Sequence, residues 1–273
     1  MSSFILKIIA MTTMFLDHLS YVVYGANTTT FLNCLGRFAM IIFCFQIVLG
    51  FQKTKNIKKY ILRLLIIALI SQIPYHLLFQ SLGFSKSLNV DFTLLLGLIS
   101  LIIINIHKNK EGKLSIQGKN KIIENLSLKS IGVLTIKVII IWLLCYTTIQ
   151  IKPLFGYCLE YSYKAILFII AISLFYPFEK DKKMIKTILY LLSIIIFGFV
   201  EAQMWFGQKG LLLPAFYTTK DALDYVLIYI FTIVGGLLPL LYNGKKGTDI
   251  QWFTYLFYPV HLLVVYLIYL LII

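Results

Sequence analysis

Long apolar runs separated by short polar connections dominate this chain. A run of about 20 apolar residues is long enough for an α-helix to cross the hydrocarbon core of a bilayer. Nine such runs cover residues 4–24, 31–50, 60–79, 91–107, 131–149, 157–176, 185–204, 225–242 and 252–273. The pattern predicts an all-α integral membrane protein, a polytopic bundle of about nine transmembrane helices, with ten as the alternative. Because the connections are mostly too short for a soluble domain, we expect a single membrane domain over residues 1–273.

The distribution of charge predicts the orientation of the bundle. The chain of 273 residues is 60% hydrophobic, its mean hydropathy is +0.88 and its formal net charge is +14. Alternate connections carry most of the cations, namely Lys53, Lys55, Lys58, Lys59, Arg63, Lys108, Lys110, Lys113, Lys119, Lys121, Lys129, Lys180, Lys182, Lys183, Lys186, Lys245 and Lys246. The other connections hold Lys86, Lys152, Lys209 and Lys220. This positive-inside bias predicts a cytoplasmic N-terminus and explains the basic charge without a nucleic-acid partner.

The first apolar run contains three ionisable residues, Lys7, Asp17 and His18. Ionisable side chains inside a span are costly, usually face the interior of a bundle, and are functional-site candidates by default. Lys7 and His18 are eleven positions apart, so at 100° per residue they fall within about 20° of one helix face. Asp17 points about 100° away from His18. His18 therefore needs an orienting partner from another helix, and Asp17 is expected to pair elsewhere.

Two positions in other runs are candidates for the same site. Arg37 in the second run is expected at a depth similar to that of His18, because consecutive helices run in opposite directions. It either contacts substrate or neutralises Asp17 and locks two helices together. His261 is expected near mid-depth in the last run, close to Tyr258. A histidine satisfied within the helical core is the alternative interpretation of His261.

The remaining polar residues lie nearer the ends of the runs, where interfacial roles compete with functional ones. His76, Asn89 and Asp91 occur at the outer ends of the third and fourth runs, and contact with lipid headgroups is the alternative for His76 and Asp91. The residues predicted to be interfacial, or to be anchors that snorkel, are Arg63, Lys137, Glu160, Lys164 and Glu201. The four cysteines show no metal-ligand spacing, so no metal site is expected.

Ordered motifs occur in the first four runs and in the last run. They begin with Leu6-Lys7-Ile8-Ile9-Ala10-Met11 followed by Met14, Asp17 and His18, then Leu35-Gly36-Arg37-Phe38-Ala39 and Gly50-Phe51. They continue with Ser71-Gln72-Ile73-Pro74-Tyr75, Leu88-Asn89-Val90 and Phe257-Tyr258-Pro259-Val260-His261-Leu262. Together these motifs resemble the TraX family of membrane proteins, named for pilin N-acetylation. That family belongs with transmembrane acyltransferases whose first helix carries a basic residue, ten residues and then a histidine, a spacing that Lys7 and His18 match.

The resemblance implies an enzyme of the bacterial cell membrane. It implies transfer of an acetyl group from cytoplasmic acetyl-CoA to an amine or hydroxyl of a peptide, a sugar or a lipid headgroup, with no metal. The expected catalytic residues are His18, Asp17 and Arg37. The residues expected to bind acetyl-CoA are Lys7, Lys53, Lys59 and Arg63. The residues expected to bind the substrate are His76, Asn89, Asp91, Tyr258 and His261.

Within this hypothesis, extended pantetheine of on the order of 15–20 Å matches the rise of about 16 Å from Lys7 to His18. We therefore expect the thioester near His18, which acts as general base or carries the acetyl group. Two rival functions stay open. A proton-coupled transporter or flippase would use Asp17, His18 and Arg37 as a proton relay, and a scaffold would use its buried charges to fix helix register. The absence of paired broken helices from the pattern argues against an inverted-repeat transporter.

Overall fold

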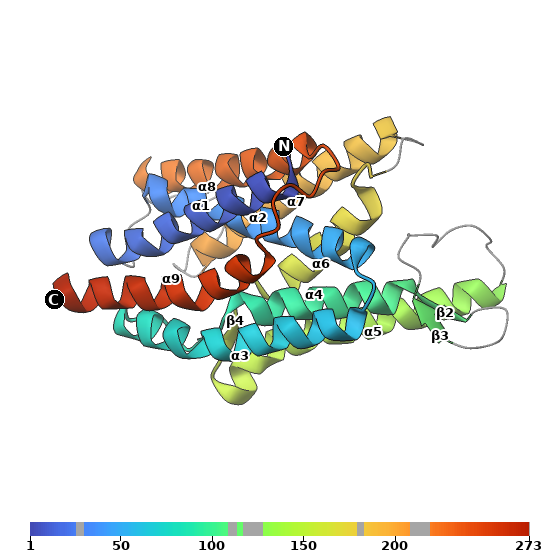
Figure 1. The fold of residues 1–273 in the computed structure, drawn as a ribbon, viewed down its shortest axis with the longest axis horizontal. Helices are drawn as coiled ribbons and strands as arrows, with labels where there is room; N and C mark the ends of the chain where they lie inside the picture. The colour runs from blue at the N-terminus through green and yellow to red at the C-terminus, as the bar shows by residue number, and fades with distance from the viewer. Residues whose placement is uncertain (26–29, 109–113, 117–127, 179–182, 208–218, 273) are drawn as a thin grey trace.

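The computed structural model describes residues 1–25, 30–108, 114–116, 128–178, 183–207 and 219–272. Within these ranges most of the chain is α-helical, and the helices run along the long axis of the molecule (Figure 1). The helices are α1 (Ser3–Tyr24), α2 (Phe31–Lys53), α3 (Ile57–Ser81), α4 (Val90–Asn105), α5 (Leu128–Phe155), α6 (Ser162–Phe175), α7 (Lys183–Gly207), α8 (Thr219–Leu237) and α9 (Gln251–Ile272). The strands are β1 (Ser87–Leu88), β2 (Ile106–Lys108), β3 (Leu114–Ile116) and β4 (Cys158–Leu159), and a 3-10 helix, η1 (Leu238–Leu241), follows α8.

Seven of the described helices are long and apolar enough to cross a membrane. The other two, α4 and α6, have 16 and 14 residues. The all-α membrane class predicted from the sequence is therefore confirmed, and each predicted apolar run overlaps one described α-helix. The run at residues 157–176 was expected to be helical throughout, but its first residues form β4 and a turn instead.

A pair of parallel strands explains why α4 and α6 are short. β1 pairs with β4, with Ser87 opposite Cys158. Asn89, the N-cap of α4, donates from its side-chain amide to the carbonyl oxygen of Ala68 (2.8 Å), which lies 13 positions before the end of α3 at Ser81. The chain therefore returns about 20 Å along α3 before α4 begins. Figure 1 shows the start of α4 and β4 part-way along α3.

Side chains of α3 and α4 satisfy this non-helical backbone, as the interior of a membrane protein requires. Gln72 donates from Nε2 to the carbonyl oxygen of Ser87 (2.9 Å) and accepts at Oε1 from the backbone N–H of Asn89 (3.0 Å). Thr93 donates from its hydroxyl to the carbonyl oxygen of Glu160 (2.5 Å). The Gln72 bonds thus fasten the start of α4 to α3, and the Thr93 bond fastens α4 to the segment that precedes α6.

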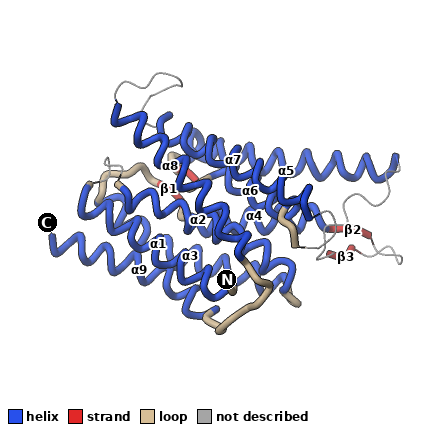
Figure 2. The backbone as a smooth tube through the Cα atoms, turned by 90° about the horizontal axis from the view of Figure 1, so that it is seen from above, coloured by secondary structure: helices blue, strands red, loops and turns tan. Residues whose placement is uncertain are grey.

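The most central helix is α2, which packs against α1, α4, α6 and α8. Figure 2 shows it between α1 and α6. Its fully buried side chains include Ile41, Ile42, Cys44, Phe45 and Val48. Gly36 lies against the carboxylate of Asp17 in α1, with no room for a β-carbon. A glycine is therefore needed for the close approach of α1 and α2.

The start of α1 lies beside the loop that precedes α9. The backbone N–H groups of Ser3 and Phe4 donate to the carbonyl oxygens of Lys245 and Lys246, each over 3.0 Å. The backbone N–H of Asn243 donates to the carbonyl oxygen of Met1 (2.9 Å). These bonds place Lys246 next to the first turn of α1.

Gly36→Ala is expected to destabilise the bundle, because the added methyl group would collide with the buried carboxylate of Asp17. Overpacking of this kind costs about 1–3 kcal/mol, which exceeds the ~1 kcal/mol that alanine gains over glycine within a helix. Thermal unfolding in detergent should show a lower midpoint for this variant. Gly132→Ala in α5 is the matched control, because a β-carbon there meets open space, and its midpoint should be unchanged or higher. Equal midpoints for the two variants would contradict the tight contact.

Candidate active site

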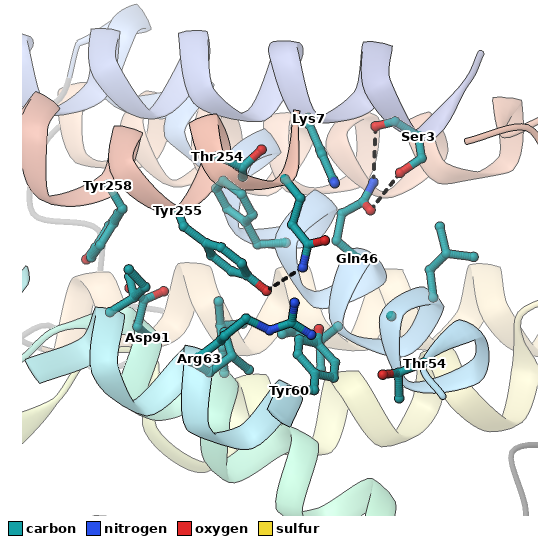
Figure 3. Close-up of a pocket in the computed structure, with 18 of the residues that line it drawn as sticks. Ser3, Lys7, Gln46, Thr54, Tyr60, Arg63, Asp91, Thr254, Tyr255 and Tyr258 are labelled. Atoms are coloured by element: carbon teal, nitrogen blue, oxygen red, sulfur yellow. Dashed lines mark hydrogen bonds between the residues drawn. The ribbon is translucent and has the colours of Figure 1, made fainter. Parts of the chain in front are cut away.

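A cavity of about 440 Å³ lies at the end of the bundle where α1 and α9 begin and α2 ends. Side chains of α1, α2, α3, α4 and α9 line it (Figure 3). The lining extends from Ser3 and Thr54, close to these helix ends, to Asp91 and Tyr258 deeper in the bundle. Its cationic residues are Lys7, Lys53, Arg63 and Lys246. We call the end with Ser3 and Thr54 the mouth of the cavity and the end with Asp91 and Tyr258 its inner end.

The cations reach the cavity from four separate segments. Lys7 of α1 and Arg63 of α3 both point into it in Figure 3. Lys53, at the end of α2, donates to the hydroxyl of Tyr242 (2.7 Å) and lies over its ring. Lys246 forms a 2.7 Å ion pair with Asp249 in the exposed loop before α9. The hydrogen bond from Lys246 lowers the pKa of Asp249, so this carboxylate stays ionised.

Lys59 was expected among these cations, but the structure places it outside the cavity lining. Since α3 begins at Ile57, Lys59 lies in the first turn of the helix and is exposed. Its backbone N–H donates to the side-chain oxygen of the N-cap Asn56 (3.0 Å). Among the predicted donor-binding residues, the cavity therefore brings together Lys7, Lys53 and Arg63, but not Lys59.

The inner end of the cavity carries two polar atoms without a hydrogen-bond partner in the described part of the chain. They are Oδ2 of Asp91, a residue 8% exposed, and the hydroxyl oxygen of Tyr258, a residue 5% exposed. Asp91 lies in the first turn of α4, where the helix dipole favours a negative charge. Both residues were predicted to bind substrate, and their unpaired atoms leave them able to accept or donate a hydrogen bond there.

Two histidines form a buried pair one helical turn beyond this inner end. Nδ1 of His18 lies 2.9 Å from Nε2 of His261, and Nδ1 of His261 lies 2.9 Å from the carbonyl oxygen of Phe257. The two imidazole planes differ by 14° and their centroids are 5.1 Å apart, as an in-plane hydrogen bond requires. The partner that His18 was predicted to need from another helix is therefore His261 of α9. Because both nitrogens of His261 are engaged, neither remains for the substrate contact expected of this residue.

His18 itself does not line the cavity. Met14, one turn before His18 on α1, and Tyr258, three positions before His261 on α9, do line it. The centroids of the Tyr258 and His261 rings are 5.5 Å apart. The passage predicted along the face from Lys7 to His18 therefore exists as far as Met14.

A buried ion network joins α2, α6 and α7. Nη1 of Arg37 is 3.3 Å from Oε2 of Glu201, and Nζ of Lys164 is 2.5 Å from Oε1 of the same carboxylate. Glu201 is 5% exposed. The expectation that Glu201 is interfacial is wrong, because α7 carries it into the bundle against two cations. The prediction for Lys164 is also wrong, since its side chain is 8% exposed and does not snorkel to an interface.

Asp17 points away from His18, as its helical position predicted. Its Oδ1 accepts from Nδ2 of Asn33 on α2 (3.3 Å), and Asn33 also donates to the hydroxyl of Ser20. The carboxylate packs against Gly36, the residue before Arg37. The α1–α2 contact thus joins Asp17 to the polar face of α2.

Tyr161 joins this network through an unusual backbone conformation. Its φ is 56° and that of Ser162 is 46°, both in the left-handed region. Non-glycine residues held there cost free energy and cluster at functional sites. The Tyr161 ring lies 5.5 Å from the guanidinium carbon of Arg37 and 6.0 Å from Nζ of Lys164. Two cation–π contacts therefore accompany the turn that opens α6.

Two residues predicted to bind substrate are placed elsewhere. Asn89 is fully buried, and Nδ2 donates both to the carbonyl oxygen of Ala68 (2.8 Å) and to Oε1 of Gln72 (3.1 Å). Its amide hydrogens are thus both bound by acceptors of α3, which corrects the expectation that it donates to substrate. His76 is partly exposed on α3 and is not part of the cavity lining.

The sequence analysis missed several polar residues of the cavity. Gln46 accepts at Oε1 from the hydroxyl of Ser3 (2.9 Å), and Gln251 donates from Nε2 to the hydroxyl of Tyr255 (3.3 Å), as the dashed lines in Figure 3 show. Gln46 interrupts an apolar run, which is a signal that could have identified it. Lys137 was also misassigned as an anchor. Its Nζ donates to the carbonyl oxygens of Ile104 and Ile106, each over 2.7 Å.

Comparison with known proteins identifies the family. The sequence model of the family described as "TraX protein" matches residues 2–269. The chain belongs to the TraX family. A relative from Dichelobacter nodosus, described as "Probable fimbrial assembly protein FimC, serogroup H1", is 28% identical over 278 residues, which cover 96% of this chain and 93% of that protein. No solved structure matches this TraX protein.

Glu201→Gln should strongly destabilise this TraX protein. The substitution leaves Arg37 and Lys164 buried without their carboxylate, and breaking a buried pair in this way costs about 3–5 kcal/mol. The measurement is thermal unfolding of the purified protein in detergent. Asp249→Asn is the matched control, because it removes a carboxylate whose pair with Lys246 is exposed, and its unfolding midpoint should stay near that of the wild type. A wild-type midpoint for Glu201→Gln would show that the network does not stabilise the fold.

Proposed function

We propose that this TraX protein is a multi-pass acetyltransferase of the bacterial cytoplasmic membrane, with the mouth of the cavity in the cytoplasm. It transfers an acetyl group from acetyl-CoA to an amine or hydroxyl of an envelope-associated peptide, sugar or lipid headgroup. The observation that carries the proposal is a cation-lined cavity whose inner end lies one helical turn from the buried His18–His261 pair. Cations at the mouth suit a polyanionic donor, and the imidazoles suit proton transfer.

The cations of the cavity bind the phosphates of acetyl-CoA, and the length of its pantetheine arm matches the distance along the cavity. Arg63 is suited to bidentate phosphate contacts, and Lys7, Lys53 and Lys246 supply point charges. Pantetheine of on the order of 15–20 Å spans the rise of about 16 Å from Lys7 to His18. The nucleotide of acetyl-CoA therefore stays near the mouth while its thioester reaches the inner end.

Met14 has to move for the thioester to meet His18. Methionine is unbranched and has three rotatable side-chain bonds, so it turns aside at low cost. The unpaired Oδ2 of Asp91 and hydroxyl of Tyr258 then lie beside the reacting groups, where they orient the acceptor or the thioester. This arrangement keeps the histidine pair away from water until a substrate fills the cavity.

His18 acts as general base in the transfer. It takes the proton from the attacking neutral amine or hydroxyl, whose nitrogen or oxygen forms a bond to the acetyl carbonyl carbon while the C–S bond breaks. The departing thiolate receives the proton from the His18 imidazolium. In an alternative course His18 attacks the acetyl carbonyl carbon first, the C–S bond breaks and CoA leaves as the thiolate, and the acceptor amine or hydroxyl then attacks the acetyl-imidazole and releases His18. Asp17 and Arg37, which are bound to Asn33 and Glu201, contribute by positioning α1 against α2.

One observation favours a second candidate function, a proton-coupled transporter or flippase. The two short helices α4 and α6 begin together at a non-helical segment inside the bundle. Interrupted helices of this kind form the substrate sites of many transporters. Here His18, Asp17 and Arg37 would relay protons. Consumption of acetyl-CoA by the purified protein in detergent separates the two functions, because a transporter would leave the thioester intact.

His18→Ala should abolish acetyl transfer while the protein still folds, because the variant lacks the general base. The assay follows labelled acetyl-CoA in membranes that contain the protein and identifies the labelled product. His76→Ala is the matched control, since His76 is outside the cavity lining, and its turnover should equal that of the wild type. Normal turnover in His18→Ala would remove His18 from the mechanism.

Arg63→Glu should raise the KM for acetyl-CoA at least 10-fold and lower kcat much less. The substitution reverses one cation of the cavity, and replacing an attraction to phosphate by a repulsion costs more than the roughly 1.4 kcal/mol that corresponds to a factor of 10. Lys59→Glu changes the net charge equally, one turn away and outside the lining, so its KM should stay near the wild-type value. Equal effects of the two variants would assign Arg63 to membrane topology alone.

A further inference from the structure

The hydrogen bonds around His261 determine which of its ring nitrogens carries hydrogen. Nδ1 of His261 lies 2.9 Å from the carbonyl oxygen of Phe257. Because a carbonyl oxygen can only accept, this nitrogen must be the donor. In a neutral imidazole the other nitrogen is then an acceptor. Nε2 of His261 therefore presents a lone pair to its neighbour.

The hydrogen bond to His261 also determines which nitrogen of His18 carries hydrogen. Its Nδ1 lies 2.9 Å from Nε2 of His261, so Nδ1 of His18 has to carry the hydrogen of this bond. Its other nitrogen, Nε2, is then free of hydrogen and carries the lone pair that a base needs. The Phe79 ring packs edge-on against the His18 ring, with centroids 5.4 Å apart, and helps to fix the imidazole plane.

The two rings are neutral in this arrangement. His18 is 6% exposed and His261 is 3% exposed. No carboxylate of the described residues forms an ion pair with either ring. An imidazolium at this position would be a buried charge without a counter-charge, which costs far more free energy than a neutral hydrogen-bonded pair.

We propose that His261 is a positioning residue that holds His18 in the Nδ1–H tautomer and so makes Nε2 of His18 the reacting nitrogen. The inference rests on the proposed acetyl transfer and names the atom that carries it out. When Nε2 takes a proton, Nδ1–H of the resulting imidazolium still donates to His261, so the partner stabilises the charge as it forms. The bond to Phe257 keeps the acceptor side of His261 turned toward His18.

The tautomer can be measured without turnover. The chain has four histidines, so ¹⁵N-histidine labelling of the purified protein gives few NMR signals, which His18→Gln and His261→Gln assign by their loss. The expected result is a protonated Nδ1 and an unprotonated Nε2 for His18. In His261→Phe, which keeps a ring but has no acceptor, His18 should show a mixture of both tautomers. His76→Phe is the control and should leave the His18 signals unchanged.

Kinetics supply the second readout. His261→Phe should lower kcat roughly 100-fold, in the range that general-base catalysis contributes, and leave the KM for acetyl-CoA unchanged. His261→Gln can place an amide oxygen near the former Nε2 and should recover about a tenth of the wild-type kcat or more. An Nε2–H tautomer or an imidazolium at His18 in the wild type, or full kcat in His261→Phe, would overturn this inference. Wild-type protein that consumes no acetyl-CoA would instead overturn the proposed function.

Discussion

Backbone amides and carbonyls buried in a bilayer must find their hydrogen bonds within the protein, and the rest of this structure depends on how that requirement is met. Most of the described chain meets it with continuous helices. The exceptions are β1 and β4, which pair with each other and are supported by Gln72, Asn89 and Thr93. Because these two segments are satisfied deep in the bundle, α4 and α6 can start there. Asp91 and Tyr161 consequently lie in the interior rather than at its surface.

Charge is divided between two regions. Four cations line the cavity, where Lys246 pairs with Asp249 of an exposed loop, whereas Glu201 lies buried between Arg37 and Lys164. Buried ion pairs add little net stability but cost much when broken, so such a network specifies which helices meet. The histidine pair lies one helical turn beyond the inner end of the cavity and carries no formal charge. The polar interior therefore has three distinct parts: a basic cavity, a neutral imidazole pair and a charge-compensated network.

The sequence predicted the parts of this structure that depend on hydrophobic length and helical period. It predicted the positions of the helices, the polar face from Lys7 toward His18, and the need for a partner from another helix. It did not predict that the partner is His261, 243 residues away, or that Glu201 meets Arg37, because one sequence carries no signal of such pairings. The roles of Asn89 and Lys59 were misjudged because each depends on where a helix begins. Residues 157–176 were predicted to form one span, because the strand β4 and the turn at Tyr161 could not be recognised within the run.

The pairing of β1 with β4 also has a consequence for biosynthesis. Leu88 leaves the ribosome about 70 residues before Leu159, which is several seconds to more than ten seconds at 5–20 residues per second. During that interval β1, the segment before α4, has no strand to pair with. Its backbone N–H and C=O groups would be unsatisfied in the hydrocarbon core, so it cannot lie in lipid. It has to wait at the headgroup layer or inside the insertion machinery until the hairpin of α5 and α6 arrives. The β1–β4 pair therefore forms only after α1, α2, α3 and α5 have been synthesised.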